Sequence, residues 1–63
     1  MEQITLEQRI SIIQDIAVMK KIMGEEPIDA HEFDVLMEIS SSSLVGLAGM
    51  MLLFCEVKLN KRL

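Results

Sequence analysis

The sequence has few of the residues that usually stabilise very short proteins. Its single cysteine, Cys55, cannot form an internal disulfide or a cysteine-based zinc site. Tryptophan and tyrosine are absent, and aromatic residues make up 3% of the 63 residues. A domain of this size buries only about 60% of the surface that its unfolded chain exposes. Because 51% of the residues are nevertheless hydrophobic, we expect one helical domain over residues 1–63 that gains part of its stability from another chain.

Basic residues are also scarce, and they form no stripe along the chain. Six Lys and Arg residues face ten Asp and Glu residues, which gives a formal net charge of −4. A phosphate backbone would repel such a chain, so we expect no nucleic-acid partner. The acids of the middle segment could form a patch for a basic protein partner, with a solvated turn as the alternative interpretation. This candidate patch consists of Glu25, Glu26, Asp29, Glu32, Asp34 and Glu38.

Long apolar runs are limited to one segment. The chain carries no charge from Ile39 to Cys55, and basic residues follow this segment. The fully apolar part begins only at Leu44 and would be about 18 Å long as a helix, whereas the hydrocarbon core of a bilayer is about 30 Å thick. The N-terminus has neither the basic nor the apolar region of a secretory signal. We therefore expect a cytoplasmic protein, with a single membrane span over residues 39–55 as the alternative.

The first helix has clear signals at both ends. Thr5 followed by Gln8 is the pattern of a capping box, and apolar residues then recur at spacings of three and four. Gly24 is well placed to end the helix, and Pro27 prevents a simple continuation. These signals predict a helix over about residues 6–23.

The second helix begins with a similar pattern, Asp29 followed by Glu32. An apolar seam then continues at helical spacing across Ser40–Ser43 without losing phase. This register predicts one long helix over about residues 30–60, which would pair antiparallel with the first as a helical hairpin. Because serine side chains compete for backbone hydrogen bonds, the alternative is a three-helix bundle broken at Ser40–Ser43.

Two bases interrupt the apolar arc of the first helix. In an antiparallel hairpin, Arg9 would lie near the serines and Lys20 near Asp34. We expect each base to make a structural pairing there or to extend its charged end to solvent, with ligand binding as the alternative.

Apolar residues cover two sides of the first helix and continue along the second helix beyond its end. One neighbouring helix cannot bury both sides, so we expect two hairpins to dimerise into a four-helix bundle. The expected contacts with a second copy or with another protein come from both helices. They are Ile12, Ile16, Met19, Phe33, Met37, Leu44, Leu47, Met50, Met51 and Phe54.

Catalytic and metal-binding patterns are weak. His31, Asp34 and Glu38 share one helical face, but neither helix carries the Glu-x-x-His arrangement of helix-supported metal sites. Cys55 has no neighbouring base to activate its thiol, so we interpret it as an apolar core residue. We expect no enzyme activity, no metal site and no cofactor.

These observations favour a non-enzymatic protein–protein interaction module that acts as a homodimer on a protein partner, whose identity the sequence does not give. In size and layout it resembles the helical-hairpin dimers of small plasmid and phage regulators, although no motif carries this resemblance. The expected role is that of a regulator, inhibitor or chaperone of bacterial or phage type. A small single-span membrane protein is the alternative.

Overall fold

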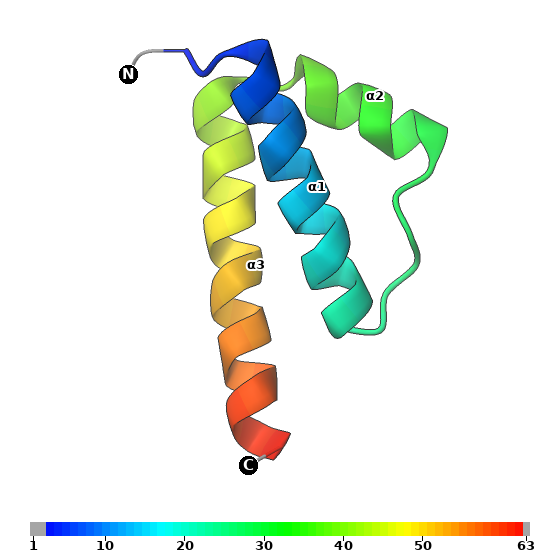
Figure 1. Ribbon diagram of the computed structural model, residues 1–63, viewed down its shortest axis with the longest axis vertical. Helices are drawn as coiled ribbons and strands as arrows, with labels where there is room; N and C mark the ends of the chain where they lie inside the picture. Colours follow the sequence, from blue (N-terminus) through cyan, green and yellow to red (C-terminus); the bar gives the residue numbers. More distant parts are fainter. Residues whose placement is uncertain (1–2, 63) are drawn as a thin grey trace.

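The computed structural model describes residues 3–62, and this part of the chain forms three α-helices without strands (Figure 1). They are α1 (Leu6–Ile22), α2 (Ala30–Glu38) and α3 (Ser41–Arg62). The all-α prediction is confirmed for these residues, while residues 1, 2 and 63 of the predicted domain lie outside the described range. α1 and α3 lie side by side, and α2 packs against the opposite side of α1 near its start.

α1 begins and ends at the predicted signals. Thr5 Oγ1 accepts a hydrogen bond from the Gln8 backbone N–H at 3.1 Å, and Gln8 Oε1 accepts one from the Thr5 N–H at 2.9 Å, so both halves of the capping box are present. At the other end, Gly24 adopts a φ of +74°, which residues with a Cβ rarely adopt. The Gly24 N–H donates to Lys21 O and the next N–H donates to Lys20 O, which is the Schellman pattern of a helix terminus.

The predicted continuous helix over residues 30–60 is wrong, because α2 ends at Glu38 and α3 begins at Ser41. Ile39 takes an extended conformation with ψ of 160°. Ser40 then caps α3, since its Oγ accepts a hydrogen bond from the Ser43 backbone N–H at 3.2 Å. The division into three helices, which the alternative predicted, is therefore confirmed. The break lies at the front of the serine run, and Ser41–Ser43 form the first turn of α3.

Long-range hydrogen bonds hold this junction against α1. Arg9 Nη1 donates to the Leu36 carbonyl oxygen at 2.9 Å, and Arg9 Nη2 reaches the buried Ser41 Oγ at 3.4 Å. The Ile4 backbone N–H also donates to Ser41 Oγ at 3.3 Å. Arg9 thus lies beside the serines, as expected. It also supplies a hydrogen-bond donor to a backbone carbonyl in the last turn of α2, where the chain leaves the helix.

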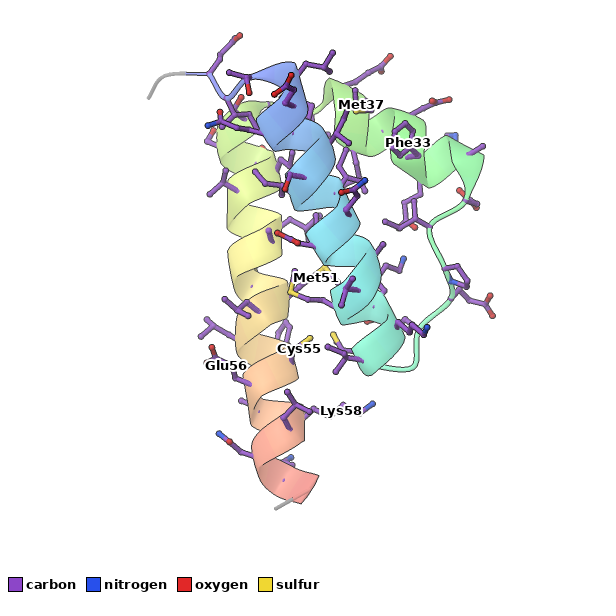
Figure 2. The ribbon with its side chains drawn as sticks, in the orientation of Figure 1. Phe33, Met37, Met51, Cys55, Glu56 and Lys58 are labelled. Atoms are coloured by element: carbon purple, nitrogen blue, oxygen red, sulfur yellow. The ribbon has the colours of Figure 1, made fainter. Side chains whose placement is uncertain are left out.

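α1 and α3 run in the same direction, whereas the sequence predicted that the short helix would pair antiparallel with the helix that contains Leu44. Ile4 contacts Ser41 at one end of the pair, and Lys58 Nζ donates to the Met23 carbonyl oxygen at 2.9 Å at the other. Figure 2 shows Met51, Cys55 and Lys58 extending from α3 toward α1. The break after α2 makes this possible, because α2 returns the chain to the start of α1 before α3 begins.

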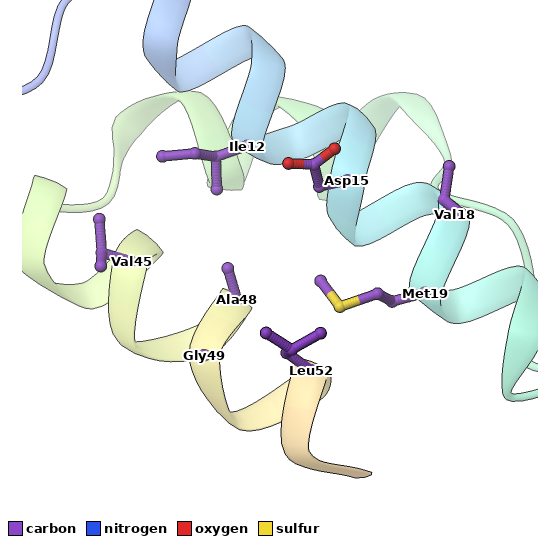
Figure 3. Close-up of a pocket in the computed structure, with 8 residues that line it drawn as sticks. All are labelled: Ile12, Asp15, Val18, Met19, Val45, Ala48, Gly49 and Leu52. Atoms are coloured by element: carbon purple, nitrogen blue, oxygen red, sulfur yellow. The ribbon is translucent and has the colours of Figure 1, made fainter. Parts of the chain in front are cut away.

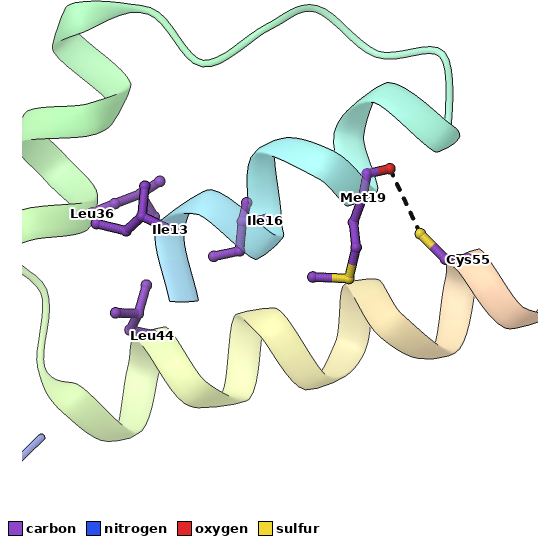
Figure 4. Packing of buried hydrophobic residues seen from close by; sticks show 6 residues of the cluster. All are labelled: Ile13, Ile16, Met19, Leu36, Leu44 and Cys55. Carbon is purple, nitrogen blue, oxygen red and sulfur yellow. Dashed lines mark hydrogen bonds between the residues drawn. The ribbon is translucent and has the colours of Figure 1, made fainter. Parts of the chain in front are cut away.

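The core is small and lies mainly between α1 and α3 (Figure 4). Leu44 and Ile16 are its most completely buried large side chains, and Leu36 adds the contribution of α2. Cys55 is buried and its Sγ donates to the Met19 carbonyl oxygen at 3.6 Å, which confirms its expected place in the core. The buried residues are Ile13, Ile16, Met19, Leu36, Leu44 and Cys55.

Candidate functional site

α3 is apolar around most of its circumference, yet α1 covers only one side of it. A helix with this pattern is normally buried on all sides, either in a protein core or in a membrane. Over Ser41–Lys61, α3 is long and apolar enough to cross a membrane, and only 11% of its most apolar part is buried. The exposed surface of α3 is therefore the main feature of the molecule that the fold itself leaves unexplained.

The structure divides the predicted contact residues into three groups. Ile16, Met19 and Leu44 are buried inside the single chain, so they are core residues of one copy. Ile12, Met37 and Met51 are half-buried at the edge of this core. The exposed members are Phe33, Leu47, Met50 and Phe54.

One row of exposed apolar side chains, which we name the outer face, lies on α3 outside the stripe that holds buried Leu44 and Cys55. Two of its members, Leu47 and Phe54, also border a pocket shared with α1 and α2. The large side chains of the outer face recur at helical spacing and stay between 38% and 62% exposed. The outer face consists of Leu47, Met50, Leu53, Phe54 and Val57.

A second apolar surface, the α1/α3 groove, lies between the two long helices and has a volume of about 490 Å³ (Figure 3). Ala48 and Gly49 form part of its α3 wall, and no atom lies within 4 Å of the place where a Cβ on Gly49 would stand. The groove is thus open above its smallest residues. Its lining consists of Ile12, Asp15, Val18, Met19, Val45, Ala48, Gly49 and Leu52.

Asp15 is the charged residue of this lining, and it is exposed. Within residues 3–62, no basic residue lines the groove. Arg9 and Lys58 donate to backbone carbonyls of α2 and of the end of α1. Glu56 lies one turn beyond Leu52 on the stripe of α3 that borders the groove.

One ion pair is present within residues 3–62, and it joins Lys20 to Glu32. The sequence had predicted that Lys20 would lie near Asp34 instead. Lys20 Nζ donates to both carboxylate oxygens of Glu32, at 2.8 and 3.0 Å. This hydrogen bond raises the pKa of Lys20 above its ordinary value of 10.5. The pair joins α1 to the first turn of α2.

The candidate acidic patch does not form one free surface. Glu32 is engaged with Lys20, and Asp29 caps α2 by accepting from the Glu32 backbone N–H at 2.7 Å. The other four acids are exposed on the α1–α2 loop and on α2; they are Glu25, Glu26, Asp34 and Glu38. His31 is exposed as well, and no group of three or more His, Cys, Asp or Glu side chains within residues 3–62 is arranged to hold a metal ion.

From the sequence, we did not predict that one groove would be lined by Asp15, Val18, Val45 and Leu52. Their grouping depends on the parallel pairing of α1 and α3, which the long-helix prediction excluded. The available signal was the second apolar stripe of α3, in which Val45, Leu52 and Leu59 repeat every seven residues.

Comparisons with protein-family models, with curated proteins and with solved structures found no match to this chain. The function is therefore argued from the outer face, the groove and the charges around them.

Proposed function

We propose that this chain is a non-enzymatic protein–protein interaction module that dimerises through the outer face of α3 and binds another protein. The observation that carries this proposal is the row of large apolar side chains that α3 leaves exposed. Contiguous apolar patches of a few hundred Å² on a soluble protein mark sites of interaction. The role we propose is that of a cytoplasmic regulator, inhibitor or chaperone of bacterial or phage type, as the size and composition suggest.

The size of the outer face suits association between two copies. A large side chain offers roughly 150–250 Å² when fully exposed, and those of the outer face are about half exposed. Together they supply several hundred Å², which approaches the roughly 800 Å² that each partner contributes to a stable interface. At about 25 cal/mol per Å², the gain is on the order of 10 kcal/mol per copy, comparable with the cost of association.

Antiparallel pairing of the two α3 helices fits this surface. It places the positive N-terminal end of one helix dipole beside the negative C-terminal end of the other. The α1–α3 pairs of the two copies then supply the four helices of the proposed bundle. Of the predicted contact residues, Leu47, Met50 and Phe54 take part in this interface, and Leu53 and Val57 join them.

The mass of the protein in solution tests the proposed dimer. Light scattering coupled to size exclusion should give a mass near twice 7.1 kDa for the wild-type chain. Leu53→Asp should lower it to the mass of one copy. Leu53 is 62% exposed in a single chain, so a charge there is costly only if a second copy buries it. Gln14→Asp, which adds the same charge at an exposed position of α1, serves as the control. A wild-type mass of 7.1 kDa at every concentration, or a Leu53→Asp variant that remains dimeric, would contradict the proposed interface.

A membrane span remains the second candidate function, because α3 has the length and composition of a spanning helix. The packing of α1 weighs against it. α1 lies along α3 and carries Glu7 and Asp15 on its surface. If α3 entered a membrane with α1 still packed on it, these acids would enter the hydrocarbon region, which is costly. If α3 entered alone, it would lose its packing against α1. Extraction of cell membranes with alkaline carbonate distinguishes the two functions, since a spanning protein stays with the membrane and the proposed module is released.

A further inference from the structure

The α1/α3 groove is lined mainly by apolar side chains, but it also carries negative charge. The groove carries the exposed carboxylate of Asp15 in its α1 wall, and Glu56 follows one turn beyond Leu52 on its α3 border. A surface of this kind suits a partner that combines an apolar stripe with positive charge.

The shape of the groove suits a helix. It runs between two parallel helices that pack along their length, and its walls include aliphatic side chains from both. Ala48 and Gly49 leave the α3 wall low, and the space above Gly49 is open, so the backbone of a third helix can approach closely there. α2 lies on the other side of α1 and leaves this groove uncovered.

We propose that the α1/α3 groove is the partner-binding site, and that it takes an amphipathic helix of another protein with lysine or arginine beside its apolar stripe. The apolar side chains of that helix occupy the space above Ala48 and Gly49. Its basic side chains pair with Asp15 and Glu56. The inference rests on the proposed function as an interaction module, and it specifies the chemistry of the partner.

A second copy of the chain does not suit this groove. If two grooves faced one another with antiparallel α3 helices crossing at Leu52, each Glu56 would lie at the level of Ala48 of the other copy. Ala48 and Asp15 line the same groove, so the two acids would approach one another across an apolar contact. Like charges in such a setting disfavour association. Self-association therefore belongs to the outer face, and the groove stays free in the dimer.

The test uses a fluorescently labelled synthetic peptide of leucine and lysine, with leucines at helical positions i, i+3, i+4 and i+7. A leucine–glutamate peptide with the same leucine positions is the matched control. Anisotropy titration of the full chain should show saturable binding of the lysine peptide. The affinity for the glutamate peptide should be lower by at least about tenfold. Equal binding of the two peptides would overturn the proposal.

Two pairs of variants locate the binding site. Asp15→Lys should weaken the lysine peptide at least about tenfold, whereas Glu26→Lys, which makes the same change of net charge in the loop after α1, should not. A Cβ at Gly49 meets no atom within 4 Å, so Gly49→Leu places a side chain into the groove, and Gly46→Leu is the same change where the space for a Cβ is also open but outside the groove. Gly49→Leu should abolish binding and Gly46→Leu should preserve it. Equal effects within either pair would overturn the proposal.

The mass measurement separates this proposal from the dimer. Asp15→Lys and Gly49→Leu should leave the mass of the free protein unchanged, while Leu53→Asp should lower the mass and still bind the lysine peptide. If Asp15→Lys changed the mass, a second copy would occupy the groove and the proposed site would be wrong. If Leu53→Asp abolished peptide binding, the peptide would bind the outer face instead, and the proposed site in the groove would again be wrong. A monomeric wild-type protein that still binds the lysine peptide through Asp15 would contradict only the dimer.

Discussion

Replacing Arg9 by methionine tests the hydrogen bonds that fix the junction between α2 and α3. The Arg9 guanidinium donates to the Leu36 carbonyl at 2.9 Å and reaches Ser41 Oγ at 3.4 Å. Methionine keeps most of the aliphatic stem, so Arg9→Met removes the charged donors and little of the packing. The Leu36 carbonyl then loses this donor at the point where α2 ends.

The expected loss of stability follows from these two bonds. A hydrogen bond with a charged donor contributes about 1.5–3 kcal/mol, and the longer contact to Ser41 adds little. We therefore expect Arg9→Met to lower the free energy of unfolding by about 2 kcal/mol. For a domain of this size, that corresponds to a decrease of roughly 10 °C in the thermal midpoint.

Thermal unfolding followed by circular dichroism at 222 nm measures this effect, with all variants at one protein concentration because dimerisation would make the midpoint concentration-dependent. Lys21→Met is the matched control, since Lys21 is exposed on the same helix. Its midpoint should stay close to that of the wild-type protein. If Arg9→Met unfolded at the same temperature as Lys21→Met, the junction would not depend on these bonds and the reasoning would be refuted.

Three further predictions concern the core, the end of α1 and the ion pair. Leu44→Ala should cost about 2–5 kcal/mol in chemical denaturation because Leu44 is fully buried, whereas Leu6→Ala at a 63% exposed position should cost far less; similar costs would mean that the core is placed wrongly. Gly24→Ala should lower the free energy of unfolding by about 1–2 kcal/mol through its φ of +74°, and an unchanged stability would exclude the left-handed terminus. The pair of Lys20 with Glu32 raises the pKa of Lys20 in the folded state, so its contribution is complete below the ordinary pKa of 10.5 and is lost as pH rises through the higher folded value. The difference in thermal midpoint between wild type and Lys20→Met should thus be constant near neutral pH and shrink in strongly alkaline buffer, and a difference that grew there would contradict this assignment.

The sequence predicted the features that depend on neighbouring residues. The capping box of Thr5 and Gln8 and the terminus at Gly24 are local, because their hydrogen bonds join groups a few positions apart. The core role of Cys55 was also predictable, since no activating group accompanies it in the sequence. Local chemistry was therefore sufficient to predict the all-α class and the bounds of the first helix.

The break at Ser40 was not resolved by the phase of the apolar seam. Phe33, Leu44 and Phe54 follow helical spacing whether or not the backbone leaves the helix between them. What decides the conformation is the balance between a helical hydrogen bond and the bond from the Ser43 N–H to Ser40 Oγ. Arg9 adds a donor from twenty-seven positions away in the sequence, and no periodicity argument includes such a contact.

The candidate site was predicted only in part for the same reason. Leu47, Met50 and Phe54 were expected at an interface and are exposed on the outer face, whereas Leu44 and Ile16 turned out to complete the core of one copy. The direction of α3 relative to α1 determines which of its stripes remains exposed. That direction follows from the break at Ser40, so the error in one element also hid the α1/α3 groove.

The parallel pairing of α1 and α3 also determines when the chain can fold during its synthesis. The contacts that bury α1 lie on α3, as in the bond between Met19 and Cys55, whose positions are 36 residues apart. Because a ribosome adds about 5–20 residues per second, roughly 2–7 s separate the addition of Met19 from that of Cys55. α1 therefore cannot bury its apolar side when it is first made, and the core between α1 and α3 forms only after α3 has also been synthesised.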